Sequence, residues 1–363
     1  MADLPPNQEI DGNERPARRG RGSTRPTIRD VSRLAGVSRM TVSRVISDPA
    51  LVLPATRARV SKAISDLGYV PDRAAGSLAS RRTGFIALML PTLTNANFAA
   101  VAHGLTEALR GSDYHLLIAY TDYDLAEEER QLRNLLARRP EAIVLTGAAH
   151  RRAASRMLLA AEIPIIEIAD LPGRPIDHAV GFSNFEVGRR AARYLLDRGH
   201  TRIGAVAGSS EGDLIDHRGE ERMRGFEDEL RRSGIATDLV LRHGAPPVSF
   251  DHGAAAITVL LDRAPDVEAV FAVSDLSAVG IVMECQRRGV SVPRDLSVIG
   301  FGDFEIGRII NPPLTTIHVD FRALGHRAGS LILGLLADDA ENTPHVIDVG
   351  LRVIERESVA QRQ

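Results

Sequence analysis

The sequence predicts an α/β protein with two parts, an N-terminal helical head and a core of two doubly wound parallel sheets. Three observations predict this fold class. Residues 27–68 place apolar side chains at helical spacing between residues that cap helices. Beyond Thr83, short apolar runs alternate with amphipathic stretches, which is typical of parallel strands connected by helices. At 363 residues and 44% hydrophobic content, the chain can also bury more than one core.

Three helices are expected in the head, over residues 28–35, 39–46 and 54–67. Their local signals are a capping-box pattern of Thr27 and Asp30, a cap residue at Ser38, and glycines at positions 36 and 68 that end the first and third helices. The side chains predicted to face inward are Ile28, Val31 and Leu34 in the first helix, Val42, Val45 and Ile46 in the second, and Val60, Ile64 and Leu67 in the third.

The first two helices and the AGVS turn between them match a helix-turn-helix, whose second helix enters the DNA major groove. Arg39 and Arg44 are the predicted base readers, because guanidinium groups bind guanine bidentately, and Met40 would pack on a thymine methyl. The full set of DNA contacts predicted in these helices is Thr27, Ser38, Arg39, Met40, Thr41, Ser43 and Arg44. The alternative is a three-helix protein-interaction module with a charged face.

The basic charge is concentrated at one end of the chain, where a solvated tail is the alternative to a DNA-binding segment. The formal net charge is only −2. Residues 1–83, however, hold about 15 Arg and Lys against about 8 Asp and Glu, which leaves about +7 at this end and about −9 in the remainder. Residues 1–24 lack apolar surface and are predicted to be a disordered basic tail.

Several classes of protein are disfavoured by what the sequence lacks. A single cysteine, Cys285, excludes an internal disulfide framework, and no Cys and His cluster has zinc-like spacing. The first residues lack the apolar core of a signal peptide, and no apolar run reaches the length of a membrane span. We therefore expect a cytoplasmic protein without a metal and without a membrane segment.

Residues 27–83 resemble the DNA-binding headpiece of the lactose/galactose repressor (LacI/GalR) family. The resemblance is carried by TIRDVSRLAGVS, TVSRVISD and TRARVSKAISDLGYVPDRAA at the family's spacing, and it continues to LRVIERESV, over about residues 25–359. It implies a periplasmic-binding-protein-like core that binds a small effector, a homodimer, and near-palindromic operator DNA as the partner. No leucine heptad follows ERESVAQRQ, so a tetramer is not expected.

The resemblance also implies a hinge helix over residues 71–80, which folds only when it pairs with that of the dimer partner on DNA. Arg73 and Ala75 would lie in this helix at the DNA, with Ala75 facing its own copy, and Leu78 would wedge into the minor groove. Gly76 departs from a good helix sequence and costs about 1 kcal/mol of helix stability relative to Ala.

In the core, a ligand is expected at the carboxyl ends of the strands. The candidate effector-binding residues, in loops that follow predicted strands, are Asn97, Phe98, Tyr123, Thr146, Glu167, Asn184, Arg218, Arg222 and Asp275. Two arginines at one crevice suggest a carboxylate or phosphate ligand, and Asp275 would accept hydrogen bonds from sugar hydroxyls or only cap a helix. No GxGxxG turn, P-loop or GxSxG elbow follows a strand, so we expect no cofactor and no catalytic activity.

The core motifs IALMLPTLTNANF, GFSNFE and NPPLTTI are similar to gluconate-type repressors. That similarity implies a sugar-acid effector such as gluconate, phosphogluconate or a ketogluconate. The expected organisation is a headpiece over 25–70, a hinge and linker over 71–83, and a core over 84–363. Chain crossings near Phe182, Pro312 and Asp339 would make one subdomain of 84–181 plus 313–339 and another of 182–312 plus 340–363.

The function that these observations favour is a transcriptional repressor that a sugar acid releases from its operator. Three alternatives stay open at this point: a sugar-binding transport component, an α/β enzyme with an added DNA-binding module, and a regulator that activates or needs its ligand as a corepressor. The helical head argues against the first, and the missing catalytic pattern argues against the second.

Overall fold

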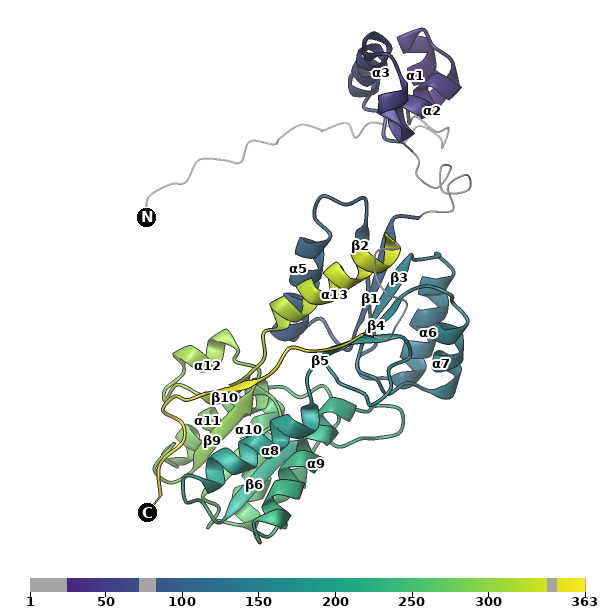
Figure 1. The fold of residues 1–363 in the computed structure, drawn as a ribbon. Helices are drawn as coiled ribbons and strands as arrows, with labels where there is room; N and C mark the ends of the chain where they lie inside the picture. Colours follow the sequence, from purple (N-terminus) through teal and green to yellow (C-terminus); the bar gives the residue numbers. More distant parts are fainter. Residues whose placement is uncertain (1–24, 72–82, 338–344, 363) are drawn as a thin grey trace, which may run out of the picture. The chain divides into compact units, whose positions relative to one another are not determined.

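The structure, a computed structural model, describes residues 25–71, 83–337 and 345–362 (Figure 1). The chain forms two compact units, residues 1–81 and residues 82–363. The predictions for the basic tail and for Arg73, Ala75, Gly76 and Leu78 lie outside the described residues.

The described residues of the first unit, 25–71, form three helices and a short 3-10 turn. Their bounds are α1 Ile28–Ala35, α2 Arg39–Ser47, η1 Pro49–Leu51 and α3 Pro54–Leu67. The predicted signals act where expected. Gly36 and Gly68 adopt left-handed backbone conformations after α1 and α3, and the Ser38 hydroxyl accepts a hydrogen bond from the Thr41 amide at 3.1 Å. The predicted helices are therefore confirmed.

The core of this unit is small. Val31, Val42 and Val60 are fully buried where the three helices meet. Two of the predicted inward residues are instead exposed: Leu34 is 55% exposed and Ile46 is 38% exposed. Helical periodicity determines which side chains of a helix share a face. The other helices cover only part of that face in α1 and α2, so Leu34 and Ile46 at its edges remain exposed to solvent.

The second unit contains two six-stranded sheets, as the alternation of strands and helices predicts. The first sheet has the order β11-β5-β4-β3-β1-β2 and all its strands are parallel. The strands are β1 Phe85–Leu90, β2 His115–Tyr120, β3 Ala142–Thr146, β4 Ile165–Ile168, β5 His178–Gly181 and β11 Val346–Asp348. The helices of this subdomain are α5 Ala96–Ala108, α6 Leu125–Leu136, α7 Arg152–Leu159 and α13 Phe321–Leu336.

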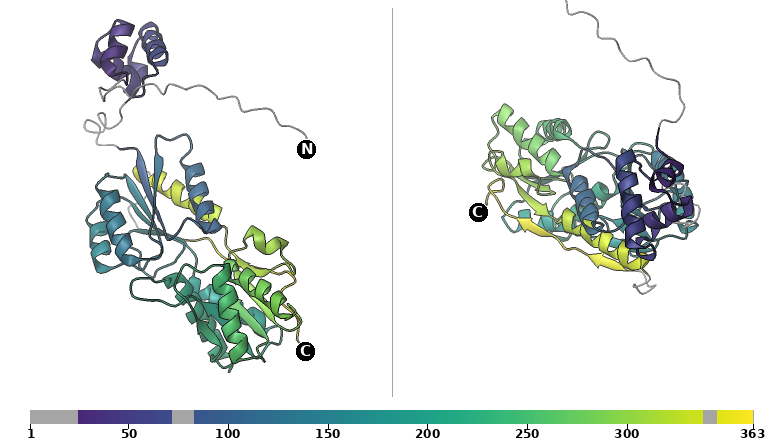
Figure 2. Two further views of the ribbon diagram at one scale, coloured as in Figure 1. Left: turned by 180° about the vertical axis from the view of Figure 1, so that it is seen from behind. Right: turned by 90° about the horizontal axis from the view of Figure 1, so that it is seen from above.

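Helices cover both faces of this sheet because its strands are apolar on both sides. Ile86 and Leu88 of β1 belong to the core on the α5 and α13 side, whereas Ala87 and Met89 belong to the core on the α6 and α7 side. Helix α13 packs against α5 although the two are far apart in sequence, as the views from behind and above show (Figure 2).

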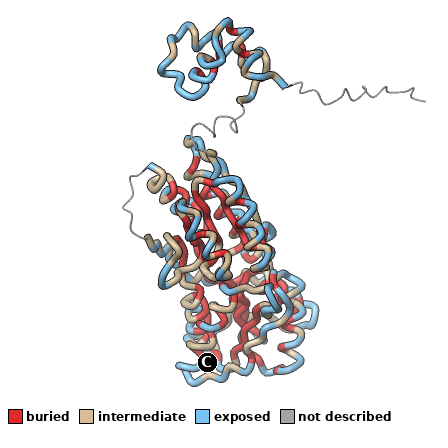
Figure 3. Tube along the Cα trace, turned by 90° about the vertical axis from the view of Figure 1, so that its right-hand side faces the viewer, coloured by how far each residue is buried: buried red, intermediate tan, exposed pale blue. Residues whose placement is uncertain are grey.

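The second sheet has the order β12-β10-β9-β8-β6-β7, and only β12 runs antiparallel to its neighbour. Its strands are β6 Ile203–Ala207, β7 Val240–Arg242, β8 Ala269–Ala272, β9 Ser297–Phe301, β10 Thr315–His318 and β12 Arg352–Ile354. Its helices are α8 Asn184–Leu196, α9 His217–Arg232, α10 Phe250–Arg263, α11 Asp275–Arg288 and α12 Glu305–Ile309. Buried residues run along the strands of both sheets (Figure 3).

Two of the three predicted chain crossings lie elsewhere. Strand β10 pairs with β9 in the second sheet, so the crossing expected near Pro312 falls after His318 instead. Strand β11 pairs with β5 in the first sheet, so the crossing expected near residue 339 falls between Asp348 and Arg352. Both strands are short edge or near-edge segments, and their few apolar residues give little periodic signal.

None of the helices in the described part of the chain is both long and apolar enough to span a lipid bilayer.

Candidate functional sites

A cleft lies at the carboxyl ends of the strands, between the two subdomains of the second unit. Its apolar lining includes five phenylalanines, Phe98, Phe182, Phe301, Phe304 and Phe321. Among the described residues that line it, the charged ones are Asp216, Arg218 and Arg222. A largely apolar cavity with a few convergent polar groups is the usual form of a small-molecule site.

Arg222 lies on α9 at the base of this cleft and is held on three sides. Its Nε donates to Asn184 Oδ1 at 3.0 Å, its Nη1 donates to the Val273 carbonyl at 2.6 Å, and its guanidinium lies 4.1 Å from the centre of the Phe301 ring. Burial lowers the pKa of Arg222 to about 10, so it remains a cation at neutral pH. Its hydrogen-bond acceptors within the described chain are both uncharged.

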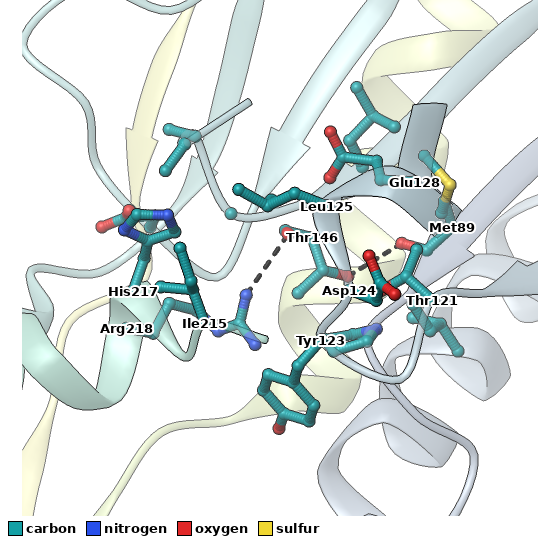
Figure 4. Close-up of a pocket in the computed structure, with 17 residues that line it drawn as sticks. Met89, Thr121, Tyr123, Asp124, Leu125, Glu128, Thr146, Ile215, His217 and Arg218 are labelled. Atoms are coloured by element: carbon teal, nitrogen blue, oxygen red, sulfur yellow. Dashed lines mark hydrogen bonds between the residues drawn. The ribbon is translucent and has the colours of Figure 1, made fainter. Parts of the chain in front are cut away.

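Arg218 lies one turn earlier on α9 and reaches across to the first subdomain. Its Nη1 donates to the Thr146 carbonyl at 3.3 Å, as Figure 4 shows. Its Nη2 lies 3.9 Å from Asp216 Oδ1, and the same oxygen accepts a hydrogen bond from the Gly219 amide at 3.1 Å. Asp216 therefore caps α9 and also partly offsets the charge of Arg218.

Tyr123, in the loop after β2, closes the cleft beside Arg218. The Arg218 guanidinium lies 5.8 Å from the centre of the Tyr123 ring. Burial, reinforced by the negative charge of Asp216, raises the pKa of the Tyr123 hydroxyl to about 12. The hydroxyl therefore stays protonated at neutral pH and can donate a hydrogen bond to a ligand.

A second cavity adjoins the cleft and shares Tyr123 and Arg218 with it (Figure 4). Its other polar walls come from the ends of β2 and β3 and from the starts of α6 and α9. They include Thr121, Asp124, Glu128, Thr146 and His217. The two cavities together make a polar region along the carboxyl edge of the first sheet.

The first unit presents a different kind of site, an exposed helix surface. Val42 and Val45 of α2 are buried, whereas Arg39, Met40, Ser43 and Arg44 of the same helix are exposed. Neither Arg39 nor Arg44 makes a side-chain hydrogen bond or ion pair with another residue of the described chain. Both long side chains are therefore available to reach base edges.

Comparison with known proteins identifies the family. Residues 27–72 match the model of bacterial regulatory proteins of the lacI family, and residues 192–359 match a periplasmic binding protein-like domain. The HTH-type transcriptional regulator GntR of Pseudomonas aeruginosa is 34% identical over 338 residues, which cover 93% of this chain and 97% of that relative. The chain belongs to the LacI family.

Solved structures of LacI-family regulators share the fold. A regulator from Silicibacter pomeroyi is 31% identical, with a TM-score of 0.84 over 92% of this chain and 99% of that one. The transcriptional regulator CelR in complex with cellobiose is also 31% identical, with a TM-score of 0.66 over 92% of this chain and 100% of that one. The protein is therefore a DNA-binding transcriptional regulator and not an enzyme.

The structure brings most of the predicted effector residues of this LacI-family core together. Asn97, Phe98, Tyr123, Arg218 and Arg222 line the cleft. Thr146 lines the second cavity, where its hydroxyl donates to the Met89 carbonyl at 3.1 Å.

Three predicted effector residues do not line either cavity. Asn184 is 1% exposed and lies behind Arg222, because its amide nitrogen donates to the Ala169 carbonyl at 3.0 Å while its oxygen accepts from Arg222. Asn184 therefore positions Arg222. Glu167 lies in β4, where alternation turns it away from the face of Ile166 and Ile168, and its carboxylate accepts from the Ile176 amide at 2.8 Å.

Asp275 is the third. It is the first residue of α11, it is fully buried, and both of its oxygens are occupied: Oδ2 accepts from the Phe304 amide at 2.9 Å and Oδ1 from the Thr316 hydroxyl at 2.7 Å. Burial raises the pKa of this carboxyl to about 6. The cap of α11 is the preceding Ser274, which does line the cleft.

Asp216, Phe301 and Phe304 also line the cleft, although they were not predicted from the sequence. Asp216 could have been predicted. An acidic residue directly before a helix is a typical N-cap, and a helix that follows a strand begins near the carboxyl ends of the strands, where ligands bind. The two phenylalanines flank a glycine-containing turn after β9 and give no polar signal of function.

Proposed function

We propose that this LacI-family regulator represses genes of sugar-acid use and releases its operator when a sugar acid binds between Arg218 and Arg222. The observation that carries the proposal is the state of the two guanidinium groups. Both arginines are only 8% exposed, they line one cleft, and their hydrogen bonds go to neutral oxygens.

A buried cation without a close anionic partner is costly, and a ligand anion offsets that cost. The single carboxylate among the described residues of the cleft lining is Asp216, at 3.9 Å from Arg218. A carboxylate or phosphate on the ligand would receive bidentate hydrogen bonds from a guanidinium fork. Gluconate, phosphogluconate and ketogluconates supply such a group together with hydroxyls that Tyr123 and Asn97 can meet.

On the DNA side, the proposal assigns base contacts to Arg39 and Arg44, a thymine contact to Met40, and phosphate contacts to Thr27, Ser38, Thr41 and Ser43. The support is that most of these side chains are exposed at the start of α2, beside the buried Val42 and Val45. Thr41 is half-buried there, and Thr27 is exposed directly before α1. A symmetric dimer would place two such helices on the two halves of a near-palindromic operator.

The ligand can change operator affinity only if it binds more tightly to one arrangement of the subdomains than to the other. Because Arg218 on α9 reaches Thr146 of the first subdomain, a ligand bonded to Arg218 and Arg222 would stabilise the closed cleft. The proposal is that closure in the core releases the operator.

A neutral sugar is the second candidate, since Asp216 can accept hydroxyl hydrogen bonds and a similar protein of known structure, CelR, is described in complex with cellobiose. A thermal-shift panel separates the two candidates, because a ligand of the native state raises stability by mass action. We expect gluconate, 6-phosphogluconate or a ketogluconate to raise the melting temperature, and cellobiose, glucose and galactose to leave it unchanged. The reverse pattern would replace the sugar-acid proposal with the neutral one.

The sign of regulation is tested with the same ligands. Fluorescence anisotropy of a labelled operator should show dissociation when the stabilising ligand is added. Tighter operator binding on addition would make the ligand a corepressor.

A further inference from the structure

The loop between β6 and α9 crosses from the second subdomain to the first. Residues 208–216 form this segment, called the strap below. At its tip, the Glu211 amide donates to the Leu214 carbonyl and the Leu214 amide donates to the Glu211 carbonyl, both at 3.0 Å, and Gly212 has a left-handed φ of 58°. Reciprocal bonds across two residues define a tight hairpin turn, so the strap has a defined conformation.

The strap pairs with the loop after β2 by backbone hydrogen bonds. The Leu125 amide donates to the Asp213 carbonyl at 3.1 Å, and the Ile215 amide donates to the Tyr123 carbonyl at 3.0 Å. Asp124 and Leu214 form an antiparallel bridge between these bonds. The two subdomains are thus joined across the cleft by a short piece of sheet.

An ion pair fixes the same contact from the side. Arg151 Nη2, in the loop before α7, pairs with Asp213 Oδ1 at the tip of the strap. Arg151 and Asp213 are 36% and 48% exposed, so solvent screens this pair and the backbone bonds carry the larger share of the contact.

The strap is connected directly to the residues that line the cleft. Tyr123, whose carbonyl accepts the strap bond, has a left-handed φ of 65°, a conformation that non-glycine residues rarely adopt unless their surroundings hold it. Ile215 is followed at once by Asp216 and then by α9 with Arg218. Figure 4 shows Ile215 and Arg218 on one side of the second cavity and Asp124 and Thr121 on the other.

We propose that the strap is a clasp that favours the closed cleft and holds Tyr123 against Arg218, with Leu125, Arg151 and Asp213 as positioning residues that set how tightly the effector is retained. These bonds exist only when the subdomains are as close as they are here, so each of them adds to the preference for closure. The proposal deepens the proposed function and rests on it for the chemistry of the effector.

The sharpest test removes one strap bond and leaves the helix below intact. Leu125 is the first residue of α6, where proline is well tolerated, and the preceding Asp124 has the extended backbone (φ −90°, ψ 118°) that proline requires of its neighbour. Leu125→Pro therefore deletes the amide that bonds Asp213. Leu125→Ala is the matched control, because it shortens the side chain but keeps the amide.

We expect Leu125→Pro to weaken binding of gluconate or 6-phosphogluconate, whichever the wild type binds, by about threefold to tenfold in titration calorimetry. We also expect hydrogen exchange in peptides that cover residues 209–216 to accelerate without ligand, since the remaining bond at Ile215 opens more often. Leu125→Ala should match the wild type in exchange. Unliganded operator binding and circular dichroism verify that both variants fold.

A second pair of variants tests the ion pair. Arg151→Ala should weaken sugar-acid binding by about twofold to fivefold, less than Leu125→Pro because the pair is partly exposed. Arg152→Ala, at the adjacent exposed arginine, should have no effect.

The proposal is overturned if the strap peptides of the wild type exchange as fast as an unprotected loop, or if Leu125→Pro and Leu125→Ala behave alike in exchange. It is also overturned if they exchange differently but bind the ligand equally. If the wild type binds no sugar acid, the proposed function fails, and the exchange comparison still decides whether the strap closes the cleft.

Discussion

The headpiece and the effector core carry their functions in different ways. The side chains that we propose as base readers, Arg39 and Arg44, lie five positions apart on one helix whose start is fixed by a local cap. In the core, Arg222 bonds residues 38 and 51 positions away, and Arg218 bonds a residue 72 positions away. A surface built by one helix follows from local sequence, whereas a cleft built by crossing chains depends on how two sheets pack.

The largest expected effect is on the effector cleft, whose residues come from distant parts of the chain. Arg222→Ala removes the guanidinium that we propose binds the ligand anion. Sugar-acid affinity should therefore fall by about 100-fold, which corresponds to the free energy of two charge-assisted hydrogen bonds. Titration calorimetry measures it. Arg224→Ala, on the exposed face of the same helix, is the control and should bind normally. A normal response in Arg222→Ala would remove Arg222 from the effector site.

The second effect separates the two units by stability. Val42→Ala leaves a cavity in the small headpiece core and should lower its free energy of unfolding by about 2 to 3 kcal/mol, with no change in the core unit. Calorimetry of the full chain should show one transition moving and the other staying. Leu34→Ala, at a 55% exposed position, should move neither. If both transitions shift in Val42→Ala, the units are not independent.

The third effect concerns DNA alone. Arg44→Ala should weaken specific operator binding by about 1 to 3 kcal/mol and leave sugar-acid binding unchanged. The quantity to measure is the ratio of operator to random-sequence affinity at one salt concentration. Lys62→Ala, on α3, serves as the charge-matched control. An unchanged ratio in Arg44→Ala would count against Arg44 as a base reader.

The smallest effect distinguishes the units by pH. In the core unit, His150 Nδ1 lies 2.8 Å from Glu128 and Nε2 lies 3.5 Å from Glu167; burial alone would lower the pKa of His150, but these carboxylates raise it from 6.5 to about 9. Stabilisation by the imidazolium is complete below about pH 6.5 and is lost as pH rises through 9.

Urea unfolding of the core unit should therefore show that the free energy of unfolding falls as the pH rises from 6.5 to 9. The headpiece should change little, because its described residues include no buried titratable side chain. His150→Gln should flatten the pH dependence of the core unit, and Glu128→Gln should reduce it. An equal slope in wild type and His150→Gln would assign the pH dependence to other groups.

The same contrast explains what the sequence could predict. The helix bounds of the headpiece follow from Ser38, Gly36 and Gly68, whose effects extend over only a turn of chain. The exposure of Leu34 and Ile46 was mispredicted because it depends on how far α3 reaches across the other helices.

In the core, strands β1 to β9 and the cleft arginines were predictable, since apolar runs mark strands and parallel strands gather their carboxyl ends. Glu167 and Asp275 were misplaced for a different reason. Glu167 lies near the end of β4 and Asp275 follows β8, where ligand residues often lie. The direction of each side chain is nevertheless set by partners elsewhere in the chain, Ile176 for Glu167 and Thr316 for Asp275.

The last segment of the chain supplies an edge strand to each sheet, β11 to the first and β12 to the second, and the Ser358 hydroxyl behind them donates to the Val298 carbonyl at 2.6 Å. A premature stop codon after α13 would therefore remove an edge strand from both subdomains. Protease cleavage just before β11 would separate from the chain the segment that pairs with both sheets. For laboratory work, a reporter protein is better fused ahead of the DNA-binding head than behind this segment.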